Sequence, residues 1–260
     1  LHGSTPDVSV AGYTLGGGMG WYARKHGLAA NSVRAIELVS GDGEVRRVSH
    51  QTDPDLFWAL RGAGFGSFGV VTSLLFRTTA IGDAATVSLD WPWAQAAQVV
   101  DVWTTFMAAA PDELSTVLAL RVPATPGGDP TLALNGMFAG TKADALAAIQ
   151  PLVTAVAPTK TSVVQRAYPA AVHYFEGNQS ETRRFLGAAS GYAYSPLSAA
   201  GRDALVQLVT ERHADPALRG GGAVLFALGG AVGRVPKAAT AFVHRKALFS
   251  VELVALWDTP

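Results

Sequence analysis

Cysteine is absent from this chain of 260 residues. Disulfides, thiolate metal sites and cysteine nucleophiles are thereby excluded. Charge is also scarce: charged residues make up 15% of the sequence, and 20 basic residues balance 20 acidic ones, so the formal net charge is zero. Such a balance gives no sign of the basic surface that binds nucleic acid or anionic membranes. The lack of cysteine suits a reducing compartment, and we expect a cytoplasmic protein.

Long apolar runs and clustered metal ligands are missing as well. No stretch approaches the ~20 apolar residues of a membrane span, and none has the pattern of a signal peptide. Without an H-x-x-x-H pair, a carboxylate triplet or a Cys/His cluster, we predict no metal site. No serine has the setting of a nucleophile elbow, which argues against a hydrolase. Hydrophobic residues still make up 49% of the chain, enough for the core of one large or two modest domains.

Glycine, in contrast, is abundant and concentrated in two places. Five of the twelve residues from Val10 to Trp21 are glycine, and a second group lies at 62–69. Ordered glycines lose much backbone entropy, and their usual advantage is a backbone that adopts positive φ and offers N–H groups to a ligand. We interpret the first stretch as a loop that faces a phosphate or a cofactor. Its spacing is neither G-x-G-x-x-G nor a P-loop, so a tight turn is the alternative.

The first 82 residues read as short helices and strands. The patterns predict a short helix within 21–31 that ends at a glycine, an alternating strand at 32–39, an Asp-Gly turn that returns a strand at 45–48, a helix begun by Asp53 and Pro54, and a long buried strand at 68–78. The two glycine-rich places lie beside these elements and could face a single extended ligand.

Residues 83–260 show a different order of elements. We predict strands at 86–91, 114–122, 130–138, 161–166, 222–228 and 248–257, and helices at 93–109, 142–156 and 197–213. This order favours an α+β domain in which helices cover one face of an antiparallel sheet.

Four ordered motifs carry a resemblance to a known family. They are Gly-Tyr-Thr-Leu-Gly-Gly-Gly-Met-Gly-Trp at 12–21, Arg-Lys-His-Gly-Leu-Ala-Ala-Asn at 24–31, Asp-Leu-Phe-Trp-Ala-Leu-Arg-Gly at 55–62 and Phe-Gly-Val-Val-Thr at 68–72. A weaker match lies at His244-Arg245 and Val251-Glu252-Leu253. In these motifs the chain resembles the FAD-linked oxidases of the vanillyl-alcohol oxidase/p-cresol methylhydroxylase (PCMH) superfamily, in the berberine-bridge-enzyme-like branch.

The resemblance implies two parts. Residues 1–82 correspond to the second half of a PCMH-type FAD-binding domain, and residues 83–260 to a substrate domain whose large antiparallel sheet is covered by helices on one face. We expect the chain to cover only the middle of the family's fold, without the preceding subdomain, its flavin-bonding histidine or the C-terminal tail. Thr5 stands where doubly attached members have a flavin-bonding cysteine, so FAD held by this chain alone would be noncovalent.

The resemblance also assigns flavin contacts. Two residues depart from the family's pattern, because Ser9 replaces a common glycine and Asn31 replaces a common aspartate. The residues expected to hold FAD through their backbone are Gly12, Tyr13, Thr14, Gly16, Gly17 and Gly18 beside the pyrophosphate and ring, and Gly69, Val70 and Val71 beside the adenosine half.

Glu252 aligns with the family's acid/base position. A base must take the hydroxyl proton as hydride leaves the substrate, and burial in this apolar strand would raise the pKa of the carboxyl toward neutrality. The alternatives are an ion pair with Arg245 or another cation, or a strand-edge carboxylate that faces water. Tyr192 is the second catalytic candidate. The candidate substrate contacts are Tyr168, His173 and Tyr194, each of which can instead be a structural aromatic residue, and His244-Arg245 is interpreted as a structural clasp.

The sequence thus predicts a bacterial FAD-dependent oxidoreductase. It would oxidise the hydroxyl of an alcohol, a sugar or a specialised metabolite, with hydride passing to flavin N5 and dioxygen as acceptor. One alternative is a truncated, non-catalytic fragment of the fold that binds no flavin by itself, and another is a flavin dehydrogenase that does not use oxygen. The expected partners are a small-molecule substrate and dioxygen, with no nucleic acid and no membrane. The identity of the substrate and the oligomeric state are left open.

Overall fold

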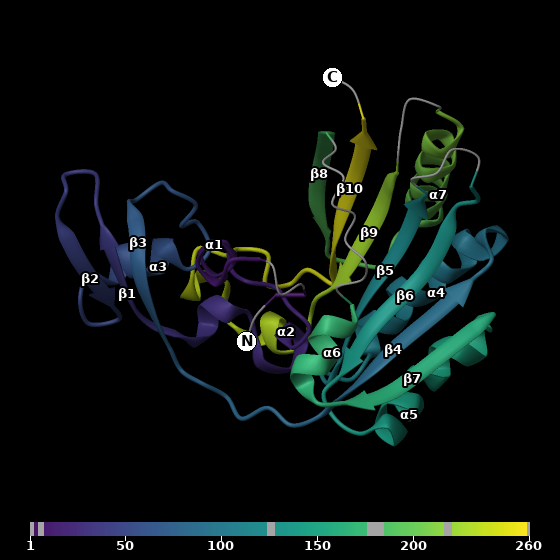
Figure 1. Cartoon of the computed structure of the whole chain (residues 1–260), viewed down its shortest axis with the longest axis horizontal. Helices are drawn as coiled ribbons and strands as arrows, with labels where there is room; N and C mark the ends of the chain where they lie inside the picture. Colours follow the sequence, from purple (N-terminus) through teal and green to yellow (C-terminus); the bar gives the residue numbers. More distant parts are fainter. Residues whose placement is uncertain (1–2, 5–7, 124–127, 176–184, 216–219, 259–260) are drawn as a thin grey trace.

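The computed structural model describes residues 3–4, 8–123, 128–175, 185–215 and 220–258. Two antiparallel sheets dominate the fold. Figure 1 shows the smaller sheet to one side of the larger one, with the glycine-rich segment, residues 10–21, lying between them. The molecule therefore places its most glycine-rich stretch where the two sheets meet.

The smaller sheet has three strands in the order β2-β1-β3. Its strands are β1 (Val33–Val39), β2 (Val45–Ser49) and β3 (Val70–Phe76), and helix α3 (Pro54–Leu60) packs against one face. Asp53 begins this helix by accepting a hydrogen bond from the Leu56 N–H, as predicted for an N-cap followed by proline. The predicted hairpin between β1 and β2 is also confirmed.

Strand β3 is far more exposed than the sequence predicted. Val70 and Leu75 are 72% and 54% exposed, although both are large and apolar. The prediction of a buried strand was wrong because α3 covers only one face of this sheet and β3 lies at its edge. A run of apolar residues cannot reveal that only one of its two faces is covered.

The larger sheet has seven strands in the order β7-β4-β6-β5-β9-β10-β8. All of its pairings are antiparallel. The strands are β4 (Ala84–Trp91), β5 (Leu114–Val122), β6 (Thr131–Phe138), β7 (Lys160–Arg166), β8 (Phe185–Ala193), β9 (Gly221–Ala227) and β10 (Phe249–Trp257). The six predicted strands are confirmed, and β8 is the strand that the sequence analysis missed, because its run of glycine, alanine and serine shows no polar-apolar alternation.

Three long helices cover one face of this sheet. They are α4 (Ala96–Ala109), preceded by the short helix η2 (Trp93–Gln95), α5 (Lys142–Ala155) and α7 (Ala199–Ala214). Thr141 and Ser198 cap α5 and α7 through their side-chain oxygens. The main core lies between helices and sheet, where Trp103 of α4 packs edge-on against Phe249 of β10. The predicted α+β fold with a large antiparallel sheet is confirmed.

The opposite face of the large sheet, called the inner face below, is covered only in part. The short helix α6 (Tyr168–Tyr174) packs on it beside Trp21 and Tyr22, in a cluster with Met137 of β6. The three long helices thus lie on one face as predicted, while α6 lies on the other. Helix α6 was not predicted from the sequence.

The remaining short elements connect the glycine-rich segment to the sheets. They are α1 (Val10–Leu15), α2 (Ala23–His26), η1 (Ala29–Ser32), α8 (Ala231–Arg234) and η3 (Lys237–Ala239). The predicted glycine stop after the helix is confirmed at Gly27, whose φ is +85°. The prediction that the whole glycine-rich segment is a loop was wrong for its first half, because Val10–Leu15 bury Thr14 and Leu15 as one face of a helix.

No helix in the described ranges is long and apolar enough to cross a membrane.

Candidate active site

The two glycine-rich stretches lie in direct contact. The N–H groups of Gly62 and Gly64 both donate to the Leu15 carbonyl, at 3.0 and 3.1 Å. A Cβ at Gly16 would lie 2.2 Å from the ring of Phe65. The two stretches are thus in contact, and a single extended ligand that faces both of them stays a prediction.

Gly17 and Gly18 adopt backbone conformations that favour glycine. Their φ angles are +112° and +80°. A Cβ at Gly17 would lie 2.8 Å from the Phe242 ring, and one at Gly18 would lie 2.6 Å from the Ala29 Cβ. These glycines are thus required first of all by packing within the protein, which the sequence pattern alone does not distinguish from a need to approach a ligand.

The same segment nevertheless presents unused donors. The carbonyls of Gly17 and Gly18 accept from the N–H groups of Ala30 and Ala29, at 3.0 and 2.9 Å. The N–H groups of Gly18, Met19 and Gly20, in contrast, have no acceptor among the residues that the structure describes. Successive free N–H groups of this kind bind phosphate or the polar edge of a flavin without a compensating lysine. The segment fits the flavin that the sequence predicted.

The other predicted flavin contacts lie on regular elements. Gly12, Tyr13 and Thr14 lie in α1, where the Tyr13 N–H already donates to the Ser9 carbonyl at 3.1 Å. Gly69 has a φ of +138°, and a Cβ there would lie 2.2 Å from the Val39 carbonyl oxygen. Val70 and Val71 pair with β1 on one side only, because β3 is an edge strand. Backbone groups on its outer side remain available to a ligand.

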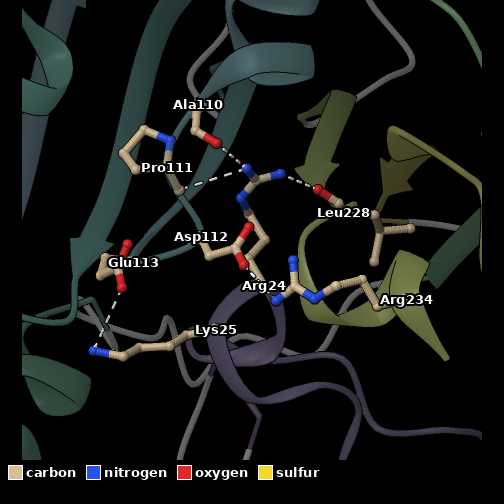
Figure 2. Close-up of polar contacts among 8 residues, drawn as sticks. All are labelled: Arg24, Lys25, Ala110, Pro111, Asp112, Glu113, Leu228 and Arg234. Carbon is tan, nitrogen blue, oxygen red and sulfur yellow. Dashed lines mark hydrogen bonds and ion pairs between the residues drawn. The ribbon is translucent and has the colours of Figure 1, made fainter.

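Arg24 of helix α2, which follows the glycine-rich segment, binds residues next to strands of the large sheet. Figure 2 shows this buried guanidinium pointing among backbone carbonyls. Arg24 Nη2 donates to Ala110 at 2.7 Å and to Pro111 at 3.5 Å, and Nη1 donates to Leu228. Burial lowers the pKa of Arg24, and the nearby Asp112 opposes that shift. The segment is thus held rigidly beside the sheet, as a preorganised site requires.

Glu252 projects from the inner face of the sheet. Its neighbour Phe249 lies in the main core, so Ser250 and Glu252 share the opposite face. Glu252 is half-buried, lies opposite Ser190 and Val224, and makes no hydrogen bond or ion pair with any described residue. The alternatives of an ion pair with Arg245 and of a strand-edge position were wrong, because Arg245 bonds elsewhere and β10 lies inside the sheet.

Tyr192, the diagonal cross-strand neighbour of Glu252, belongs to an aromatic cluster with Tyr194, Phe242 and His244. Tyr192 lies on β8 opposite Ser250, on the same inner face as Glu252. Its ring stacks on His244 with centroids 3.9 Å apart and an interplanar angle of 11°, and it meets Phe242 edge-on at 6.0 Å. Because Phe242 bears against Gly17, the cluster connects the carboxylate face of the sheet to the glycine-rich segment.

The remaining predicted substrate contacts lie elsewhere. Tyr168 and His173 are on α6, which packs against β4, and three strands separate β4 from β10. Tyr168 instead adjoins Tyr13, whose pKa is raised by burial and by Tyr168. The structure therefore brings Tyr192 and Tyr194 close to the Glu252 side of the sheet, and places Tyr168 and His173 at its other end.

The part that Phe242 and His244 play in this arrangement was not predicted from the sequence. The His-Arg motif was interpreted as a structural clasp, and this description fits Arg245, which is fully buried. The signal for His244 was weak, since it precedes a strand by several residues and contacts Tyr192 from 52 positions away. Only the tertiary fold reveals that pairing.

Comparisons with known proteins place this geometry in a family. No family model matches the chain. The uncharacterised FAD-linked oxidoreductase YgaK of Bacillus subtilis is 30% identical over 265 residues, which cover 99% of this chain and 56% of that protein. A xylooligosaccharide oxidase of Thermothelomyces thermophilus is 33% identical over 168 residues, or 62% of this chain and 32% of that protein. The structure of Physcomitrella patens BBE-like 1 has a TM-score of 0.87 at 25% identity, covering 99% of this chain and 57% of its own.

The chain spans little more than half the length of curated relatives such as YgaK. Within that span the likeness extends from one end of the chain to the other, in sequence and in fold. The chain belongs to the berberine-bridge-enzyme-like family of FAD-linked oxidoreductases.

Proposed function

We propose that this chain forms part of an FAD-dependent oxidase that acts on the hydroxyl of an alcohol, a sugar or a specialised metabolite, with dioxygen as acceptor. One observation carries the proposal. A half-buried carboxylate that has no partner among the described residues, Glu252, lies on the inner face of a sheet whose aromatic cluster packs against Gly17 of the glycine-rich segment. A base and a flavin-binding backbone would thus face the same space.

Relatives support a carbohydrate hydroxyl as the group oxidised. The Thermothelomyces protein is a xylooligosaccharide oxidase, and a Gibberella zeae protein that is 31% identical over 68% of this chain is a chitooligosaccharide oxidase. A sheet face lined by aromatic rings and hydroxyl groups suits a sugar, which offers both apolar ring faces and polar edges. We therefore favour an oligosaccharide over a small alcohol.

In the proposed mechanism, Glu252 accepts the proton of the substrate hydroxyl as hydride leaves the adjacent carbon. The Tyr192 hydroxyl binds the same oxygen and orients it. Burial raises the pKa of Tyr192, so this phenol stays protonated and acts as a hydrogen-bond donor. The N–H groups of Gly18, Met19 and Gly20 would hold FAD, which supplies the hydride acceptor when bound. Gly69 to Val71 would contact its adenosine half.

The first experiment is a visible absorption spectrum of the purified chain, before and after acid precipitation. Flavin bands near ~450 nm that pass into the supernatant would support noncovalent FAD. Oxygen consumption with xylooligosaccharides and simple alcohols would then test the substrate class. Flavin that is reduced by substrate but reoxidised only by a dye would favour a dehydrogenase instead. A chain that stays colourless after FAD is added would overturn flavin binding by this chain alone.

A further inference from the structure

We infer that His244 is a positioning residue that fixes the ring of Tyr192 in the candidate active site, an inference that rests on the function proposed above. The two rings are nearly parallel, 3.9 Å apart at 11°. Tyr192 lies at the end of β8 on the inner face, where its same-face neighbour on the strand, Ser190, is too small to hold its rotamer. Stacking on a second ring supplies that restraint.

The imidazole is itself held from two sides. The Tyr194 hydroxyl lies 2.7 Å from His244 Nδ1, a hydrogen bond that fixes the rotation of the ring. Phe242 meets the imidazole edge-on, with centroids 5.7 Å apart at 81°. Three contacts of different kinds thus leave His244 a single orientation, with its face against Tyr192.

The support extends to the glycine-rich segment. Phe242 bears against Gly17, and a Cβ at Gly62 would lie 2.2 Å from the Phe242 backbone nitrogen. The ring stack therefore rests on both glycine-rich stretches. Its position relative to any ligand held by those stretches is set by packed backbone, which deforms less than side chains do. This arrangement suits a role of His244 in holding the Tyr192 phenol at a fixed position in the site.

The inference is first tested without flavin, by NMR of the chain labelled in its tyrosine rings. Tyr194→Phe removes one exposed oxygen and is compatible with folding, since Tyr194 is 56% exposed. We expect the Tyr192 ring signals to shift in Tyr194→Phe and in His244→Ala. They should stay in place in the control His213→Phe, which alters a histidine in the last turn of α7. Unchanged Tyr192 signals in both test variants would overturn the inference.

A second test uses the FAD-loaded chain and anaerobic reduction of the flavin by xylobiose. A misplaced catalytic group lowers the rate of the chemical step more than it weakens binding. We expect His244→Ala to lower the limiting rate by about tenfold with little change in half-saturation, and His244→Phe, which keeps a stacking ring, to recover most of it. A wild-type rate in His244→Ala overturns the inference. If the chain takes up no FAD, the proposed function fails for this chain, and the NMR test still decides the positioning.

Discussion

Arg245 donates from Nη1 to the side-chain oxygen of Asn31 at 2.9 Å, joining two residues 214 positions apart. The guanidinium is fully buried, and Nη2 donates to Thr240. Burial, followed by the nearby charge of Arg61, lowers the pKa of Arg245 to about 10, so it remains charged at neutral pH. The partners of this buried cation are an amide, Asn31, and a hydroxyl, Thr240. The family's pattern has an aspartate in place of Asn31.

This contact predicts that Asn31→Asp stabilises the protein. The carboxylate would accept from the Arg245 guanidinium and keep the bond from the Leu28 N–H. Replacing a neutral acceptor by a charged one should raise the free energy of unfolding by about 1–2 kcal/mol. Urea unfolding at neutral pH measures the change. Gln51→Glu adds the same charge at an exposed position and serves as the control. A destabilised Asn31→Asp protein would show that Arg245 does not need a counter-charge.

The carbonyl contacts of Arg24 predict a large loss of stability in Arg24→Met. Three backbone carbonyls would lose their donor in the interior, and the expected destabilisation is about 3 kcal/mol or more. Arg234→Ala is the matched control, because Arg234 pairs with Asp112 in the same region but is 64% exposed. It should change stability by less than ~1 kcal/mol. Equal effects in the two variants would mean that the buried contacts contribute no more than the exposed pair.

Two glycines of one segment are expected to respond to alanine with opposite signs. Gly17→Ala should destabilise by about 1–3 kcal/mol, because its φ is positive and the new methyl would meet Phe242. Gly12→Ala should stabilise by about 0.5–1 kcal/mol, because Gly12 lies in a helix with nothing within 4 Å of the added methyl. Thermal unfolding compares the two. A fall in FAD affinity in Gly12→Ala would identify Gly12 as a ligand contact.

The assignment of Glu252 as the base predicts a slow Glu252→Gln variant. The amide keeps the shape of the side chain and cannot take a proton, so flavin reduction by substrate should slow by about a hundredfold. Stability and FAD content should stay near wild type, since the carboxylate has no partner among the described residues to lose. Glu211→Gln on α7 is the control. Turnover close to wild type in Glu252→Gln would show that another group is the base.

Two tyrosines in contact, Tyr22 and Tyr168, predict a loss of stability at alkaline pH. The rings of Tyr22 and Tyr168 lie 4.8 Å apart, and burial raises the pKa of each from 10.0 to about 12. Between pH 10 and pH 12, the two tyrosines stay protonated in the folded chain and are deprotonated in the unfolded chain. Their contribution is therefore complete below pH 10 and is lost as the pH rises toward 12. Urea unfolding across this range should show a smaller loss in Tyr168→Phe than in wild type. An equal slope would exclude Tyr168 as a source.

The regular elements were predictable because their causes are local. The cap formed by Asp53 and Pro54, the stop at Gly27 and the six strands of alternating residues each depend on neighbours in sequence. Strand β8 was missed for the same reason, since its small residues carry no periodic signal. The exposure of Val70 was predicted wrongly because burial depends on what covers a face.

Some features of the candidate site were likewise predictable from the sequence, and others were not. The sequence by itself identified the family and the glycine-rich segment and predicted Glu252 as a candidate base, because these depend on motif order and residue type along the chain. The tertiary structure alone decided that Tyr192 shares a face with Glu252, that His244 stacks on it, and that Phe242 brings both against Gly17. Those contacts join residues up to 225 positions apart. Side-chain packing between distant segments leaves no local pattern, so only the folded chain shows it.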